Sequence, residues 1–101
     1  MNIDTRFNEE SRRLVIAVSG RLDFKVHKEF RQAYEGVEQT PAEVVVDLRN
    51  TEYMDSSGLG MLLLLRDYYG AEKSNIRIES PNEELGKVLA IANFDKLFTI
   101  A

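Results

Sequence analysis

Glu43-Val44-Val45-Val46-Asp47-Leu48 holds three β-branched residues in a row, with no alternation of polar and apolar positions. This pattern indicates a strand that is buried on both faces, and such strands lie in the centre of a parallel or mixed sheet. We therefore expect the flanking sequence to supply further strands, together with the helices that cover them.

Strand and helix patterns alternate on either side of this run. Apolar alternation and short apolar runs predict further strands at 3–7, 13–19, 75–79 and 97–100, of which the first and last are weakly marked. Helical spacing of apolar residues predicts helices at 26–37, 57–69 and 81–93, with a loop at 49–54. This order predicts one layered α/β domain over residues 1–101, a small mixed β-sheet flanked by about three α-helices.

Short polar signals mark where the expected helices begin and end. Asp23 is a plausible N-cap for the first helix, and Thr40-Pro41 breaks it. Gly70 is a good stop for the second helix. Ser80-Pro81-Asn82-Glu83 is typical of a capping box with Pro at the first helical position of the third helix. Phe24 leaves two interpretations open, a hydrophobic staple for the first helix or an exposed contact residue.

Composition narrows the class of protein. An apolar fraction of 44% and a charged fraction of 30% are typical of a globular domain. The chain has no Cys, which excludes disulfides and thiolate metal sites and favours a reducing cytoplasm. The first residues have no apolar signal region, and the run Met61–Leu65 is too short to span a membrane. With a net charge of −4 and no basic stripe, we expect a protein partner rather than nucleic acid or a membrane.

The run Met54-Asp55-Ser56-Ser57-Gly58-Leu59-Gly60 follows the buried strand and opens the second expected helix. Loops at the carboxyl ends of strands concentrate function in open α/β sheets. The free N–H groups and the dipole of a helix start favour an anion, so a serine here suits a phosphate. Gly58 and Gly60 would let another molecule approach closely. Ordinary N-capping explains the same residue types, so the turn alone leaves both interpretations open.

The second expected helix is apolar on nearly every side. Leu59, Leu62 and Leu63 can supply a core face with Arg66 at its border. The remaining large side chains then point partly elsewhere; they are Met61, Leu64, Leu65 and Tyr68. A helix of this kind is either buried all round or covers a partner, and the sequence leaves both possibilities open.

At this point the chain resembles a known family. Met54-Asp55-Ser56-Ser57-Gly58-Leu59-Gly60 is similar to the phosphorylation-site signature of the STAS-domain anti-sigma factor antagonists. Gly20-Arg21-Leu22-Asp23 resembles the family's Gly-x-Leu-Asp segment, and Val44-Val45-Val46-Asp47-Leu48 resembles its central strand. Leu97-Phe98 resembles the segment after its third helix, so the likeness covers nearly the whole chain.

The resemblance implies a non-enzymatic, cytoplasmic bacterial phosphoprotein that regulates transcription without a cofactor or metal. Its unphosphorylated form would bind an anti-sigma factor with serine kinase activity and so release the sigma factor. Phosphorylation of Ser56 would block that binding, and a PP2C-type phosphatase would restore it. The resemblance and the adjacent apolar helix together give the expected partner-binding residues: Asp23, Phe24, Asp55, Ser57, Gly58, Leu59, Met61 and Leu62.

Two other functions compete with this one. Serine catalysis would depend on His27, the one His in the chain, and no Gly-x-Ser-x-Gly elbow, phosphate loop or cluster of metal ligands is visible. The stronger alternative is a STAS-like accessory subunit of an ABC-type lipid transporter, or a ligand-sensing module. In those proteins the same surface would dock without a phosphorylation cycle.

Overall fold

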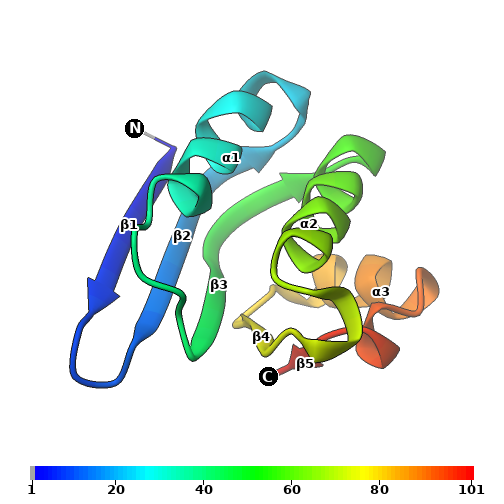
Figure 1. Ribbon diagram of the computed structural model, residues 1–101. Coiled ribbons are helices and arrows are strands. Elements are labelled where there is room, and N and C mark those ends of the chain that lie inside the picture. Colours follow the sequence, from blue (N-terminus) through cyan, green and yellow to red (C-terminus); the bar gives the residue numbers. More distant parts are fainter. Residues whose placement is uncertain (1) are drawn as a thin grey trace.

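Five strands form one mixed sheet in which the spatial order follows the sequence order (Figure 1). They are β1 (Ile3–Asn8), β2 (Arg13–Leu22), β3 (Glu43–Met54), β4 (Ile76–Glu79) and β5 (Thr99–Ile100). β1 pairs antiparallel with β2, and every later neighbour pairs in parallel. This computed structural model describes residues 2–101 and confirms the predicted α/β class.

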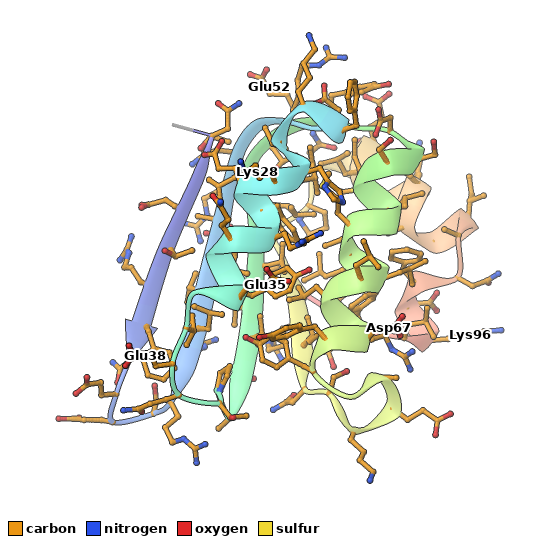
Figure 2. The ribbon with its side chains drawn as sticks, turned by 45° about the horizontal axis from the view of Figure 1, so that its top comes forward. Lys28, Glu35, Glu38, Glu52, Asp67 and Lys96 are labelled. Carbon is orange, nitrogen blue, oxygen red and sulfur yellow. The ribbon has the colours of Figure 1, made fainter. Side chains whose placement is uncertain are left out.

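Three α-helices provide the parallel crossovers: α1 (His27–Glu35), α2 (Ser56–Tyr68) and α3 (Glu83–Ile91). Short 3-10 turns accompany them, namely η1 (Phe24–Val26), η2 (Ala71–Lys73) and η3 (Phe94–Lys96). Parallel crossovers are right-handed, and here each one steps in the same direction across the sheet. All three helices therefore cover the same face, where α1 and α2 run side by side (Figures 1 and 2).

The core lies between this face and the helices. Alternate residues of β2 and β3 point into it and are at most 2% exposed, namely Leu14, Ile16, Val18, Val44, Val46 and Leu48. The helices contribute Phe30, Leu62, Leu65, Leu85 and Leu89 to the same cluster. None of the three helices has the length and apolarity to cross a membrane, as judged over residues 2–101.

Val45 points to the opposite face of the sheet, yet it is only 1% exposed. Its neighbour on β4 is Arg77, which donates from Nε to Glu79 at 3.1 Å. Arg13 of β2 reaches the same Glu79 at 3.6 Å and Glu43 at 2.9 Å. Within β3 the run Val44–Val46 is therefore buried on both faces as predicted, whereas Glu43 and Asp47 on either side of it are half-buried. We attribute the cover over Val45 to the stems of these charged side chains rather than to helices.

The predicted loop at 49–54 was wrong, because β3 continues to Met54. Two register shifts accompany this continuation. Ala17 pairs with Asp47 but Ser19 with Asn50, and Gly20 pairs with Thr51 but Arg21 with Tyr53, so β3 gains one residue at each place. The strand beyond the first shift pairs with the last residues of β2 and ends where Leu22 lies opposite Met54.

The capping box predicted at 80–83 was placed two residues too early. Asn82 is the N-cap of α3, and its Oδ1 accepts the Leu85 N–H at 2.8 Å. Ser80 has a φ of 58°, a left-handed conformation that belongs to the turn before the helix. Asn is as good an N-cap as Ser, and the chain begins the helix after the later residue.

Candidate functional site

The two loops singled out by sequence lie next to each other, because β2 and β3 end side by side. Asp23 follows β2 and its Oδ1 accepts the Lys25 N–H at 3.0 Å, which caps η1. Asp55 follows β3 and its Oδ1 accepts the Gly58 N–H at 3.0 Å, which caps α2. Two carboxylates thus fix two helical starts at the same edge of the sheet.

Ser56 is the first residue of α2, and both Ser56 and Ser57 are exposed. Asp55 takes the Gly58 N–H, whereas the N–H groups of Ser56 and Ser57 precede the first intrahelical acceptor. Those groups and the positive end of the helix dipole lie around the Ser56 side chain. The position is therefore accessible and electrostatically suited to carry a phosphate.

Gly58 does not open the site to another molecule, and this corrects the role expected for it. It is buried, and a Cβ at this position would lie 2.4 Å from the Leu22 carbonyl oxygen and 2.6 Å from Cγ of Met54. The missing side chain lets the first turn of α2 rest on the end of β2. Gly60, in contrast, has nothing within 4 Å of its would-be Cβ.

The buried face of α2 also differs from the prediction. Met61, Leu62 and Leu65 are 2%, 0% and 0% exposed, whereas Leu63 and Leu64 are 39% and 48% exposed. Residues 58, 61, 62 and 65 follow the i, i+3, i+4, i+7 spacing of one helical face, and that face points to the sheet.

Leu62 therefore cannot contact a partner and belongs to the core, which corrects its predicted role. Leu59 is half-buried and packs against the core as well. Leu59, Met61 and Leu62 are the apolar residues of this helix that were predicted to contact a partner. Of these three, Met61 alone lines an open groove, where it forms part of the floor.

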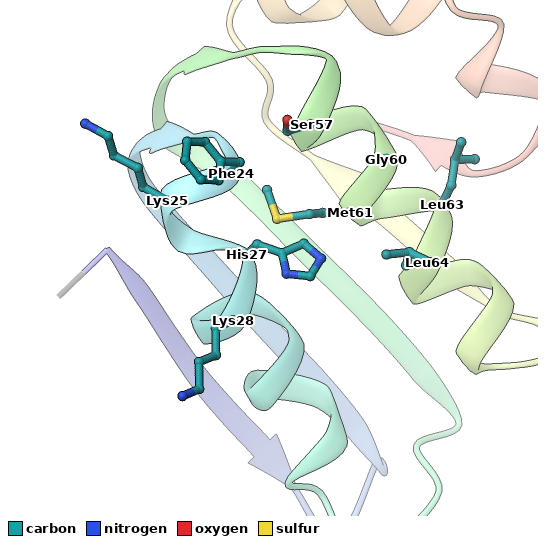
Figure 3. A pocket seen from close by; sticks show the side chains of 9 residues that line it. All are labelled: Phe24, Lys25, His27, Lys28, Ser57, Gly60, Met61, Leu63 and Leu64. Carbon is teal, nitrogen blue, oxygen red and sulfur yellow. The ribbon is translucent and has the colours of Figure 1, made fainter.

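That groove runs between η1 and α1 on one side and α2 on the other, with a volume of about 750 Å³. Its lining residues are Phe24, Lys25, His27, Lys28, Ser57, Gly60, Met61, Leu63 and Leu64. Figure 3 shows the His27 ring facing α2 near Met61 and Leu64, with Phe24 closer to Ser57. Phe24 is 70% exposed, which contradicts a buried staple and makes this ring a wall of the groove.

The α1 side of the groove was not predicted from the sequence. Lys25, His27 and Lys28 looked like an ordinary solvated helix start, and the i, i+3, i+4 spacing from Phe24 to His27 and Lys28 was the available signal. No group of three or more metal-ligating side chains occurs within the described part of the chain.

A model of the "Mlab, STAS domain" family matches residues 5–99 of this chain. The chain belongs to the STAS domain family. A STAS-domain containing protein of Pseudomonas aeruginosa is 51% identical over 92 residues, which span 91% of each chain.

Several solved structures share the fold of this chain. An anti-sigma factor antagonist from Mycobacterium paratuberculosis aligns with a TM-score of 0.80 at 23% identity, covering 97% of this chain and 84% of that one. The anti-sigma factor antagonist SpoIIAA in its unphosphorylated form gives 0.76 at 19% identity, covering 98% and 87%. Bacillus SpoIIAA in the phosphorylated form gives 0.66 at 18%, covering 98% and 90%. At these identities the likeness establishes the fold alone.

Proposed function

We propose that this STAS domain is an anti-sigma factor antagonist that works by partner switching. Its unphosphorylated form binds an anti-sigma factor or equivalent regulator with serine kinase activity and so releases the regulator's target. Phosphorylation of Ser56 ends the binding, and a PP2C-type phosphatase restores it. The observation that carries the proposal is the exposed Ser56 at the first position of α2, beside an open apolar groove.

A phosphate on Ser56 would act differently on the fold and on the surface that binds the partner. A phosphate adds about −1.5 to −2 charges and three acceptor oxygens. At a helix N-terminus this group is well accommodated, so the domain keeps its structure. A partner that must exclude water from the surface around Ser56 meets a new charge there and loses affinity. SpoIIAA, which shares this fold, is known in both unphosphorylated and phosphorylated forms, which supports such a cycle.

The other residues expected at the site divide into two groups under this proposal. Asp23 and Asp55 are positioning residues, since each carboxylate caps a helical start. Gly58 and Leu59 hold α2 in place, because Gly58 packs against Leu22 and Leu59 packs against the core. Direct contact falls to Phe24 and Ser57, which line the groove, with Met61 at its floor.

A second candidate function is docking without a phosphorylation cycle, as in an accessory subunit of an ABC-type lipid transporter. The groove favours this candidate in one respect, because its apolar surface does not include Ser56. Under that function Ser56 would be one more exposed residue, and its charge would not control binding.

The deciding experiment incubates the protein with ATP and the anti-sigma-type serine kinases of its host, and maps the label by mass spectrometry. Ser56 should carry the phosphate, Ser56→Ala should remain unlabelled, and Ser57→Ala should label normally. Absence of label, or label on Ser57, rules out the proposed switch. Calorimetry with the labelling kinase then compares Ser56→Asp with Ser56→Ala, and equal affinities would show that charge at this position controls nothing.

A further inference from the structure

β1 forms one edge of the sheet and, among residues 2–101, pairs with β2 on its inner side only. Figures 1 and 2 show β1 on the outer side of α1. The opposite edge is β5, which has two residues, whereas β1 has six. A long edge strand presents unpaired backbone groups to which another strand can bond. β1 is therefore the edge of this sheet that can accept a further strand.

The backbone of β1 alternates between bonding to β2 and facing outward. The Ser19 N–H donates to the Asn2 carbonyl oxygen at 2.8 Å, and these two residues continue the register of the β1–β2 pair. In an antiparallel pair, the residues that exchange hydrogen bonds recur at every second position. The even-numbered residues of β1 therefore bond to β2. The N–H and C=O groups that face outward are consequently those of Ile3, Thr5 and Phe7.

The side chains of β1 carry opposite charges on either side of Thr5. Asp4 and Arg6 are both exposed and share the face of the sheet that the helices leave open. Ile3 and Phe7 point to the helix face, where Ile3 belongs to the core and Phe7 is half-buried against it. Reversing the strand about Thr5 exchanges the acidic position with the basic one, and the edge is therefore complementary to itself.

A second copy of β1 fits this edge in an antiparallel register centred on Thr5. Thr5 then lies opposite Thr5 of the second copy, and Ile3 lies opposite Phe7. All of these residues have outward-facing backbone groups, so about six backbone hydrogen bonds form. In the same register Asp4 of each copy lies directly opposite Arg6 of the other, and opposite charges at such positions stabilise a sheet.

The neighbouring registers are less favourable. A register centred between two residues would place outward-facing backbone groups opposite groups that already bond to β2. A register centred on Asp4 would place Asp4 opposite itself, and one centred on Arg6 would place Arg6 opposite itself. Like charges directly opposite each other destabilise a strand pair, and both shifts also shorten the ladder. The register centred on Thr5 is therefore selected by hydrogen bonding and by charge.

A hollow beside β1 suits the side chains of an added strand. It has a volume of about 220 Å³ and lies at the edge of the helix face, lined by Ile3, Thr5, Glu29, Gln32 and Ala33. Opposite residues of an antiparallel pair share a face of the sheet, so Phe7 of the second copy would lie next to Ile3 on this side. Its ring would then bury apolar surface in the hollow.

We propose that this chain forms a two-fold dimer through β1, in the register that places Asp4 opposite Arg6 of the second copy. The axis is perpendicular to the sheet, so the two sheets join and the helices of both copies cover the same face. The strand ends that carry Asp23 and Ser56 then lie at opposite ends of the dimer. This inference goes beyond the proposed function and does not depend on it, because β1 takes no part in the candidate site.

Sedimentation equilibrium of the untagged chain tests the dimer, which should dissociate on dilution because the ladder is short. Asp4→Arg and Arg6→Asp each place like charges opposite each other across the axis. Each should raise the Kd of the dimer about tenfold or more at low salt. An equal mixture of the two variants should associate at least as tightly as the wild type, because every Arg again faces an Asp. A monomer at concentrations up to about 1 mM, or a mixture that does not associate, overturns the proposal.

Hydrogen exchange locates the interface within the strand. The amide protons of Ile3, Thr5 and Phe7 should exchange more slowly as the protein concentration rises. Those of Asp4 and Arg6 should change little, because they already bond to β2 in the monomer. Protection that does not differ between the two sets would contradict pairing through the outer edge of β1.

Thr5→Pro removes one outward donor and leaves the bonds to β2 in place, as an edge strand allows. It should abolish the dimer while the circular dichroism spectrum stays native. Leu64→Ser and Ile91→Ser should leave the dimer intact, because these side chains, 48% and 83% exposed, lie on α2 and α3. A dimer that either of them dissolves and Thr5→Pro does not would involve another surface and overturn the proposal. If Thr5→Pro unfolds the chain, the mixture of charge variants decides, since both of its substitutions are at exposed side chains.

Discussion

Gly58 packs against the Leu22 carbonyl oxygen so closely that a Cβ at position 58 would lie 2.4 Å from that oxygen. The contact joins the first turn of α2 to the last residue of β2. It therefore fixes the position of Asp55 and Ser56 relative to Asp23, which follows the end of the neighbouring strand. The geometry of the candidate site depends on the absence of one side chain.

Gly58→Ala should destabilise the domain by about 1–3 kcal/mol, because neither the Leu22 backbone nor the buried Met54 side chain can move away at low cost. Gly60→Ala is the matched control, two residues further along the same helix with open space around it. It should stabilise the helix by about 0.5–1 kcal/mol through propensity alone. Urea unfolding measures both, and equal effects of the two variants would contradict the packing role of Gly58.

Asp55→Ala should cost about 0.5–2 kcal/mol, since the Gly58 N–H loses its side-chain acceptor. Asp55→Asn keeps an oxygen at the same place and should retain most of the stability. Thermal unfolding of the three proteins at neutral pH checks this prediction. If the Asn variant is as unstable as the Ala variant, the charge of Asp55 matters more than the cap.

Ser56→Asp should leave the free energy of unfolding unchanged or raise it by about 0.3–1 kcal/mol, because a negative charge at a helix start interacts favourably with the dipole. Ser56→Ala should show no such gain. Denaturant unfolding at low and high salt is the measurement, and the gain should vanish at high salt. A clear loss of stability in Ser56→Asp would mean that charge at this site acts through unfolding rather than through the surface.

The sequence was sufficient for the parts of the fold that follow from periodicity. The central strand and the order of elements were predicted correctly, whereas Asp23, expected to cap the first helix, caps η1 instead, and the N-cap of α1 is Val26. The second half of β3 was missed, because its pairing depends on two register shifts, opposite Ala17–Ser19 and Gly20–Arg21, that no local pattern marks. Whether such a segment forms a strand depends on how it pairs with a neighbouring strand in the folded chain.

The faces of α2 show a second limit. A helix with apolar residues on nearly every side does not show from its sequence which face is buried. The prediction therefore put Leu63 inside and Met61 outside, and the structure shows the reverse. Packing of Gly58 on Leu22 sets the rotation of the helix, and that contact joins residues far apart in sequence. The groove residues His27 and Lys28 were missed for the same reason, since α1 acquires its neighbour only in the folded chain.

Tyr69 lies in an aromatic cluster at the far end of α2, with ring centroids 5.0 Å from Tyr68 and 6.2 Å from Tyr34. Its hydroxyl donates to the Tyr34 carbonyl oxygen at 3.3 Å. Desolvation by burial, followed by the neighbouring Tyr68 and Tyr34, raises the pKa of Tyr69 from 10.0 to about 12. The folded state thus favours the neutral phenol.

The sign of the pH dependence follows from that shift. The stabilisation is complete below pH 10, where Tyr69 is neutral in the folded and unfolded chains alike, and it is lost between pH 10 and 12 as the unfolded chain releases the proton first. Tyr69→Phe should therefore lose less stability than the wild type across this interval in urea unfolding. Tyr53→Phe, which removes the hydroxyl of a tyrosine that is 42% exposed, is the control. Parallel losses in the wild type and Tyr69→Phe would show that other groups cause the alkaline instability.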